Sequence, residues 1–388
     1  MGDGGQHWPD RPYAVRGDLV IDGGLVRGAV VVEGERIAEV VREPRDGELP
    51  EGVIDGAIVA PGLIDLQVNG GFGIEVGEDP AAIRYLAERL PETGVTAFLP
   101  TVITAPAAHY QRVFEAFAAA HQSPGARVLG LHLEGPFLSP RRAGAHRPEL
   151  IEAADGELFE ALLMGDGLRL MTLAPERGDA HERIRRLRER DILVSLGHTD
   201  ASYEEFVAGV DAGARMATHL YNAMSPFGHR APGAIGAALV EDRVTVGLIA
   251  DGVHSHPASV RLAVRAKGAE RIALVSDMMP AAGMPPGQYE LGGQPVIVDG
   301  TTARLADGTL AGSIVTLDQA IRNVVRWTEA TPAEAIRMAS EVPARLLGMA
   351  ETGRIAAGCA ADLVLFDDDL NVEATIVGGQ IAFRRGDA

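Results

Sequence analysis

Cysteine is almost absent from this chain of 388 residues, whose only one is Cys359. A single cysteine excludes an intramolecular disulfide framework and fits a reducing compartment. The surrounding sequence, RIAAGCAADLVLF, is mostly apolar, so we expect Cys359 to be a small buried side chain. The first residues, MGDGGQHWPDRP, lack the basic start and the apolar stretch of a secretory signal. We therefore expect a cytoplasmic protein.

Positive charge and long apolar runs are also scarce. The formal net charge is -19, which disfavours nucleic acid or an anionic membrane as a partner. Apolar runs stop well short of the roughly 20 residues that a transmembrane helix needs. A hydrophobic fraction of 46% beside 23% charged residues is typical of a globular protein with ample material for a core. We expect neither a nucleic-acid nor a membrane partner, and an anionic ligand would need cationic groups gathered around it.

The two ends of the chain share a strand-rich character. Residues 18–60 alternate short Val/Ile-rich stretches with DGG, EGER and DGEL, which is typical of hairpins. The segment GRIAAGCAADLVLFDDDLNVEATIVGGQIAF near the C-terminus has the same pattern. We predict that residues 1–60 and 353–388 form one small composite β-sandwich domain, and that residues 61–352 form a larger domain between them.

Eight short apolar runs recur within residues 61–352. At least six of them end in a residue that can hold a metal ion, move a proton or fix a substrate. The runs are LIDLQVN at Gln67 and Asn69, TAFLPT at Thr101, VLGLHLE at Glu134, LRLMTLAPE at Glu176, ILVSLGH at His198, MATH at His219, VTVGLIAD at Asp251 and RIALVSD at Asp277.

Segments with helical spacing of apolar residues separate these runs. They are AAIRYLAERLPETG, AHYQRVFEAFAAAH, AHERIRRLRER, YEEFVAGVDAG and PASVRLAVRAKG. Alternation of strands and helices predicts parallel βα units. Because eight units occur and no glycine-rich dinucleotide fingerprint follows the first run, we predict an α/β fold with a (β/α)8 TIM-like barrel.

Three of the strand-end residues form a candidate metal site. In a parallel barrel every strand ends at the same face, so Glu134, His198 and His219 should converge there. Three protein ligands that leave a fourth position to water are the usual set of a catalytic zinc site. A lone histidine at a strand end is more often a structural hydrogen-bonding group, but three such residues at one face favour a metal site.

Asp277 closes the eighth run. A carboxylate beside metal-activated water can take its proton and later pass a proton to the leaving group. An isolated aspartate at this position would more often cap a helix or form a salt bridge. The order Glu, His, His, Asp across runs three, five, six and eight favours the catalytic role.

The sequence as a whole resembles the amidohydrolase superfamily, and within it the N-acetylglucosamine-6-phosphate deacetylase family. The similarity runs almost end to end through PGLIDLQVNG, GLHLEGPFL, AGAHRPE, GHTDAS, ATHLYNAM, IADGVH and LVSDMMPAAG. It implies a metal-dependent (β/α)8 barrel with a β-sandwich built from both ends, hydrolytic removal of acetate from an N-acetylated amino sugar phosphate, and a homodimer.

One departure from the wider superfamily concerns the metal count. Many amidohydrolases carry His-x-His at the end of the first strand and can hold a second metal there, whereas this chain has Gln67 and Asn69. Neutral amides are poor zinc ligands. One branch of the deacetylase family shares the Gln-x-Asn variant and works with a single metal, so we expect one divalent ion per subunit, with Zn²⁺ as the expected metal.

The resemblance also assigns substrate contacts. His146 would act on the scissile amide beside the main chain of Ala145, while Asp277 would transfer protons without a covalent intermediate. The other substrate-contacting positions that it implies are Asn222, Ala223, Arg230, His254, Leu310, Ala311, Gly312 and Ser313. Arg230 and His254 match phosphate contacts, and a planar guanidinium suits phosphate oxygens.

Two other readings remain open from the residues. One is an amidohydrolase acting on an N-acyl amino acid or a cyclic amide, but many such enzymes bridge two metals with a strand-end lysine, and Lys267 lies in a helical segment. The other is a catalytically dead barrel that serves as a scaffold, which the intact Glu134, His198, His219 and Asp277 disfavour. A serine nucleophile is unsupported because no G-x-S-x-G motif occurs.

Overall fold

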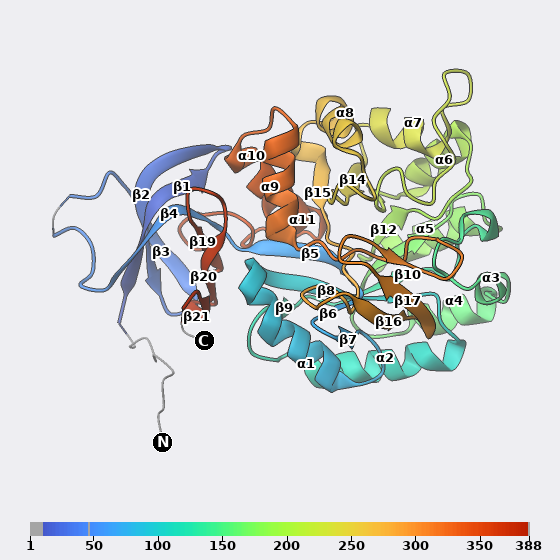
Figure 1. Cartoon of the computed structure of the whole chain (residues 1–388), viewed down its shortest axis with the longest axis horizontal. Helices are drawn as coiled ribbons and strands as arrows, with labels where there is room; N and C mark the ends of the chain where they lie inside the picture. The colour runs from blue at the N-terminus through green and yellow to red at the C-terminus, as the bar shows by residue number, and fades with distance from the viewer. Residues whose placement is uncertain (1–10, 46, 387–388) are drawn as a thin grey trace.

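The computed structural model describes residues 11–45 and 47–386 (Figure 1). Most of the N-terminal segment on which the prediction of a missing secretory signal rests lies outside these residues. In Figure 1 the blue strands from the start of the chain lie beside the red strands from its end, and the barrel occupies the other side of the molecule. The fold is therefore a parallel barrel with a separate sheet made from both chain ends, which confirms the predicted fold class.

The separate sheet has seven strands in the order β21-β20-β19-β4-β1-β2-β3. The strands are β1 (Tyr13–Ile21), β2 (Gly24–Glu33), β3 (Arg36–Arg42), β4 (Val53–Pro61), β19 (Leu363–Phe366), β20 (Val372–Val377) and β21 (Gln380–Arg384). Its own apolar core draws on both ends of the chain and includes Val15, Val30 and Leu363. Cys359 is buried in this core, as expected. The domain limits at residues 61 and 353 stay a prediction.

The barrel contains all eight predicted runs as parallel strands in the order β15-β14-β13-β12-β11-β10-β8-β5, with β9 beside β8. The nine strands of this sheet are β5 (Leu63–Val68), β8 (Val95–Ile103), β9 (Arg127–Val128), β10 (Leu131–Glu134), β11 (Leu168–Leu173), β12 (Leu193–Leu196), β13 (Met216–Ala217), β14 (Thr245–Leu248) and β15 (Ile272–Leu274). The segment after β15 closes the circle onto β5, because the Asp277 amide donates to the Gln67 carbonyl at 3.0 Å and the Asn69 amide donates to the Met278 carbonyl at 2.9 Å.

All five predicted helical segments form helices. They are α1 (Pro80–Arg89), α2 (Ala107–Ala120), α5 (Ala180–Arg188), α6 (Tyr203–Ala212) and α8 (Pro257–Lys267). The others are α3 (Pro148–Glu152), α4 (Gly156–Leu163), α7 (Gly233–Val240), α9 (Leu317–Trp327), α10 (Pro332–Met338) and α11 (Glu341–Leu346), with 3-10 turns at Leu90–Thr93, Pro140–Arg142 and Ala269–Arg271. None of the helices in the described part of the chain has the length and apolar character needed to cross a membrane.

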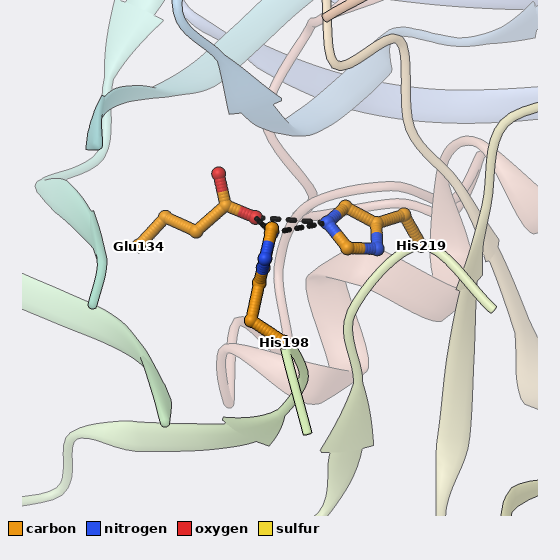
Figure 2. A group of neighbouring side chains, drawn as sticks. All are labelled: Glu134, His198 and His219. Atoms are coloured by element: carbon orange, nitrogen blue, oxygen red, sulfur yellow. Dashed lines mark hydrogen bonds and ion pairs between the residues drawn. The ribbon is translucent and has the colours of Figure 1, made fainter. Parts of the chain in front are cut away.

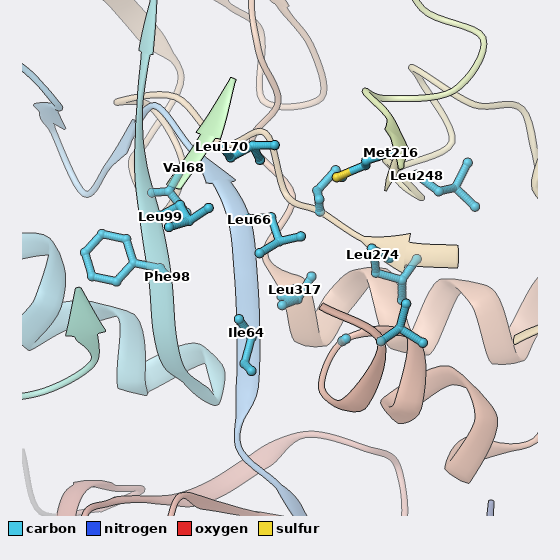
Figure 3. Close-up of a cluster of buried hydrophobic side chains, with 14 of the residues drawn as sticks. Ile64, Leu66, Val68, Phe98, Leu99, Leu170, Met216, Leu248, Leu274 and Leu317 are labelled. Carbon is cyan, nitrogen blue, oxygen red and sulfur yellow. The ribbon is translucent and has the colours of Figure 1, made fainter. Parts of the chain in front are cut away.

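The helices cover the barrel through one continuous core. Figure 3 shows side chains of β5, β8, β11, β13, β14 and β15 packed together with Leu317 of α9. On β5, Asp65 and Gln67 alternate with apolar residues. Successive side chains of a strand point to opposite faces, so Asp65 and Gln67 share one face. The polar side chains of this strand therefore face the inside of the barrel and lead up to the strand end.

A small three-stranded sheet interrupts the βα pattern after β15 and was not predicted. It consists of β16 (Gly287–Leu291), β17 (Gln294–Val298) and β18 (Ala303–Arg304), while β6 (Gly70–Gly71) and β7 (Ile74–Glu75) form another short hairpin after β5. Gln294 Nε2 donates to the Ala145 carbonyl at 2.6 Å, so this insert reaches across the strand-end face of the barrel. Its apolar side chains form a core of their own with Ile103 and Met279.

Candidate metal centre and active site

Glu134, His198 and His219 meet at the strand-end face of the barrel (Figure 2). Figure 2 shows their side chains pointing toward one common position. Glu134 Oε1 lies 3.0 Å from His219 Nε2 and 3.3 Å from His198 Nε2, and the two Nε2 atoms are 3.1 Å apart. All three residues are buried. The predicted convergence of these three residues is thus present in the fold, although their role as ligands stays a proposal.

The tautomer of His198 suits a metal ligand. Its Nδ1 lies 2.8 Å from the backbone carbonyl of Arg142. A carbonyl oxygen can only accept, so Nδ1 carries the proton and the lone pair of Nε2 points toward Glu134 and His219. Gly144 leaves room for this ring, because a Cβ atom at that position would lie 3.0 Å from His198 Cε1. Such an outer contact on a ligand histidine is the usual way to fix its ring.

The charge of Glu134 also fits a cation. Burial alone would raise the pKa of Glu134, but the adjacent imidazoles of His146, His198 and His219 hold it well below its ordinary value. An ionised carboxylate with two imidazoles is a typical zinc donor set. The three donor atoms lie within 4.8 Å of one another. The residues present therefore fit one divalent metal ion.

Asp277 lies beside this set and is held by two side-chain amides. Gln67 Nε2 donates to Asp277 Oδ1 at 2.9 Å, and Asn69 Nδ2 donates to the same oxygen at 2.7 Å. Gln67 Nε2 also donates to Glu134 Oε1 at 3.0 Å. Burial, and then the charge of Glu134, raise the pKa of Asp277 to about 6. A carboxyl group with a pKa near neutrality is suited to both accept and return a proton.

His146 approaches the same site from the loop after β10. Its Nδ1 receives the backbone N–H of Thr104 at 3.1 Å, so Nδ1 is an acceptor and a neutral ring must carry its proton on Nε2. Burial, and then the charges of His198, lower the pKa of His146 to about 4, which keeps the ring neutral. His146 Nε2 lies 3.6 Å from Glu134 Oε2. The Nε2–H group is therefore aimed at the centre of the site as a hydrogen-bond donor.

Several site residues have an unusual backbone conformation. His198, His219 and Asp277 have φ values of 46°, 28° and 51°, and Ala223 has a φ of 48°. This left-handed region is uncommon for residues other than glycine. Non-glycine residues in sparsely populated backbone regions cluster at functional sites, where the surrounding structure supports the strain.

A cavity of about 370 Å³ opens above the candidate metal ligands, at the lower end of the roughly 300–1,000 Å³ usual for small-molecule sites. Most of the residues singled out from the sequence line it. These are Asn69, Glu134, Ala145, His146, His198, His219, Asn222, Ala223, His254, Asp277, Leu310 and Gly312.

Three of the expected substrate contacts do not line the cavity. Arg230 is exposed on the loop before α7. Ala311 is buried in the apolar core of the three-stranded insert. Ser313 is buried and donates through Oγ to the Ser276 carbonyl at 2.6 Å. The substrate contacts expected of Arg230, Ala311 and Ser313 stay predictions.

His254 forms one polar wall of the cavity. Its Nδ1 lies 2.7 Å from Asp251 Oδ2, so the carboxylate at the end of the seventh strand orients the ring. Burial would raise the pKa of Asp251, but the hydrogen bond with His254 holds it below its ordinary value. The ionised Asp251 therefore holds the His254 ring in place at the cavity wall through this contact.

Other wall residues were not identified from the sequence. They are Ile103, Arg141, Arg142, Ala143, Gly144, Leu291 and Thr309. Arg141 and Arg142 both pair with Asp200, at 3.1 and 2.8 Å. The RRAG sequence beside the expected substrate contact Ala145 was the one signal that could have indicated them.

A parallel barrel that gathers one carboxylate, two imidazoles and a further aspartate at its strand ends has the architecture of a metal-dependent hydrolase. The chain belongs to the amidohydrolase family, whose sequence model matches residues 58–382. Its relatives within that family include N-acetylhexosamine 6-phosphate deacetylases, which confirms the resemblance inferred from the sequence.

Two curated relatives and one solved structure illustrate the match. N-acetylglucosamine-6-phosphate deacetylase of Bacillus subtilis (strain 168) is 42% identical over 84% of this chain and 85% of its own length. N-acetylgalactosamine-6-phosphate deacetylase of Escherichia coli O157:H7 is 41% identical over 84% of this chain and 88% of its own. A mutant N-acetyl-D-glucosamine-6-phosphate deacetylase of Mycobacterium smegmatis in complex with N-acetyl-D-glucosamine-6-phosphate superposes with a TM-score of 0.90 at 32% identity, over 96% of this chain and 99% of that one.

Proposed function

We propose that this protein removes the acetyl group from N-acetyl-D-glucosamine 6-phosphate, giving D-glucosamine 6-phosphate and acetate in amino sugar catabolism and recycling. The observation that carries the proposal is the meeting of Glu134, His198 and His219 with Asp277 and His146 in one buried site. The names of its relatives support the amino sugar phosphate as the substrate.

We propose that the cofactor is one divalent metal ion per subunit, with zinc as the metal, held by Glu134, His198 and His219. When bound, the ion would polarise the acetyl carbonyl and lower the pKa of a water molecule toward about 7. The side-chain amides of Gln67 and Asn69 donate hydrogen bonds to Asp277. Their donors are already used on a carboxylate, which supports a single metal position.

The remaining steps fall to Asp277 and His146. Asp277 Oδ1 is held by two amides, so Oδ2 is left to accept the proton of the attacking water. The same carboxyl group then returns the proton to the departing amine nitrogen. His146 Nε2–H donates to the carbonyl oxygen as negative charge builds there, which stabilises the transition state. No covalent intermediate with the protein forms.

The phosphate is proposed to bind at the side of the cavity formed by Asn222, Ala223 and His254. Backbone amides next to His219 and the ring of His254 supply donors for it. Arg141 and Arg142 also line the cavity, but their charge is shared with Asp200. Arg230 would add a planar donor. Because Arg230 is exposed and lies outside the cavity walls, we propose that it contacts the phosphate of a substrate bound in a second subunit.

We propose that the protein is cytoplasmic and forms a homodimer. Phe227, Val240 and Leu262 are large apolar side chains with exposed fractions of 62%, 63% and 53%. They lie on the loop before α7, at the end of α7 and on α8, and α7 packs against α8. Exposed apolar groups on neighbouring elements are typical of an interface. Sedimentation velocity of the purified protein tests this assembly directly.

The proposed reaction is tested by acetate release from purified, zinc-loaded protein. The substrates are N-acetylglucosamine 6-phosphate, its galacto epimer and unphosphorylated N-acetylglucosamine. We expect the gluco 6-phosphate to be hydrolysed with the highest kcat/KM. Equal rates with and without the phosphate would refute a sugar phosphate as the substrate, and a preference for the galacto epimer would reassign the sugar alone.

A further inference from the structure

A second cavity lies next to the catalytic cavity and has no assigned role. It measures about 300 Å³ and is formed around the ends of β5 and β8, the start of α2 and the Gly292–Gly293 turn between β16 and β17. Asn69, Ile103 and Leu291 line both cavities. These three side chains are 2%, 8% and 3% exposed, so buried side chains form a shared wall where the two spaces adjoin.

We propose that the second cavity is an acyl subsite, which lets the enzyme hydrolyse N-acyl groups longer than acetyl, such as propanoyl and butanoyl. The inference rests on the proposed function, because it concerns the group that departs from the same sugar phosphate. Ile103 would then be the residue that sets how far the acyl chain can extend.

The direction of the substrate supports this placement. The residues proposed to bind the phosphate include Asn222 and His254. They belong to the segments that follow β13 and β14, the sixth and seventh strands of the barrel. The second cavity lies at the first and second strands, with the candidate metal ligands in between. A secondary amide is planar and strongly favours the trans form. A substrate whose sugar lies toward the phosphate-binding residues therefore directs its acyl chain away from these residues, toward the second cavity.

The chemistry of the shared wall also fits an amide with an alkyl chain. Asn69 Nδ2 must donate to the Asp277 carboxylate, which fixes the orientation of the amide. Asn69 Oδ1 is buried and has no hydrogen-bond partner among the described residues. A buried acceptor is unfavourable unless it is paired, and the N–H of the scissile amide is the donor that every N-acyl substrate carries. Beyond this wall, Val76, Val102 and Leu150 supply apolar surface, while the polar part of the lining comes from Glu75, Thr101, Thr104, His109 and Arg147.

The size of the second cavity is sufficient. A methylene group is close in volume to a water molecule, whose share of liquid volume is about 30 Å³. The two additional methylenes of a butanoyl group would need about 60 Å³, well within the about 300 Å³ found here. Burial of each methylene would increase the affinity for the substrate about fourfold. This gain would offset the entropic cost of ordering a longer acyl chain.

The test measures kcat/KM for N-acetyl, N-propanoyl and N-butanoyl glucosamine 6-phosphate with the full-length, zinc-loaded protein, by amine release. We expect the longer substrates to be hydrolysed within about tenfold of the acetyl one. Rapid hydrolysis of the acetyl substrate with a loss above about 1,000-fold for butanoyl would overturn the acyl subsite and leave the proposed function intact. Failure on all three would remove the proposed function and the subsite together.

Gly77→Phe fills the second cavity and serves as the blocking variant. Gly77 lines only that cavity, and the nearest atom to an added Cβ is His109 Cε1 at 4.0 Å. We expect at least about a 30-fold loss on butanoyl and less than about a twofold change on acetyl. Gly156→Phe is the matched control, because Gly156 lies outside both cavities and an added Cβ meets nothing within 4 Å. An equal loss on both substrates, or no loss on butanoyl, would count against the subsite.

Ile103→Ala gives a readout that does not depend on the folding of the blocking variant. Removing this side chain from the shared wall should raise the ratio of butanoyl to acetyl kcat/KM by about fivefold or more. An unchanged or lower ratio, with the protein folded and the metal retained, would contradict the role of Ile103 as the limit of the acyl chain.

Discussion

Asn69 Nδ2 and Asp277 Oδ1 are joined by a hydrogen bond of 2.7 Å at the centre of the barrel mouth. Gln67 adds a second donor to the same oxygen. In many amidohydrolases a pair of histidines stands at the positions of Gln67 and Asn69 and can hold a second metal. Here two neutral amides contact the aspartate directly, so their N–H groups replace part of the favourable electrostatic environment that a second cation would provide.

Asn69→Leu should reduce kcat/KM by roughly 10- to 150-fold, because a hydrogen bond to a charged group contributes about 1.5–3 kcal/mol. The hydrogen bond from Asn69 lowers the pKa of Asp277, so its loss should also move the acid limb of the pH–rate profile to higher pH. A zinc content equal to that of the wild type is the control. An unchanged acid limb with a lowered rate would mean that Asn69 acts through packing.

Asp277→Asn should bind substrate and metal but hydrolyse the amide very slowly. Asparagine keeps the shape of the side chain and cannot accept the proton from water. General acid–base catalysis contributes about 10² to 10⁴ in rate, and this carboxyl group is proposed to act in both proton transfers, so we expect a loss near or above the upper value. Retention of more than about a tenth of wild-type turnover, with zinc still bound, would exclude Asp277 as the base.

Metal analysis should give close to one equivalent of zinc per chain after gentle purification. His198→Ala and His219→Ala should each lose most of it, since two remaining ligands hold zinc poorly. His229→Ala is the matched control, because His229 is exposed and lies outside the catalytic cavity. Two equivalents in the wild type would show that Gln67 and Asn69 do not prevent a second metal from binding.

Most of the barrel could be predicted because each strand and helix carries its own hydrophobic period. The run LIDLQV became β5, and the segment PASVRLAVRAKG became α8.

The three-stranded insert was missed, although the sequence ELGGQP contains a hairpin signal. In the structure Gly292 and Gly293 have φ values of 59° and 72°, as a tight turn requires. An interruption of a regular βα pattern has no periodic signal of its own, and this one supplies Leu291 to both cavities.

The candidate metal site could be predicted because the strand ends of a parallel barrel converge independently of the loop conformations. His146 lies in a loop, so only the family resemblance pointed to it. The contacts that fix the histidine tautomers were beyond prediction, since they use the backbone N–H of Thr104 and the backbone carbonyl of Arg142. Every residue has such groups, and only the tertiary fold decides which of them face a ring.

Arg230→Ala should lower kcat/KM for the 6-phosphate by roughly 10- to 150-fold, through the loss of a charged hydrogen bond. Activity on unphosphorylated N-acetylglucosamine should barely change. Arg326→Ala, on exposed Arg326 of α9, is the matched control. Equal losses on both sugars would give Arg230 a structural role.

Mixing Arg230→Ala subunits with Asp277→Asn subunits tests the proposal that Arg230 acts across a dimer. In a mixed dimer the first subunit keeps Asp277 and can receive Arg230 only from the second. Recovery of activity above that of either variant alone supports contact between subunits. The absence of recovery, with mixed dimers present, would place Arg230 in its own subunit's site.

Asp65 should make the stability of the protein depend on pH. This carboxyl group is buried, its Oδ1 accepts the backbone N–H groups of Gln67 and Ser276, and its Oδ2 has no partner among the described residues. Burial raises the pKa of Asp65 to about 7, above the value of about 3.9 in an unfolded chain. Its contribution to stability is therefore complete below about pH 4 and is lost as the pH rises through about 7.

Asp65→Asn removes this titration, because asparagine cannot ionise and keeps the acceptor oxygen. The difference in Tm between Asp65→Asn and the wild type should therefore shift in favour of the variant from pH 5 to pH 8. We expect a shift of about 2 °C or more, since 1 kcal/mol corresponds to roughly 2–4 °C in a large domain. Thermal unfolding of zinc-loaded protein provides the measurement, with Asp368→Asn at an exposed position as the control. Parallel curves for Asp65→Asn and the wild type across this range would mean that Asp65 is ionised throughout, and that the barrel interior stabilises its charge.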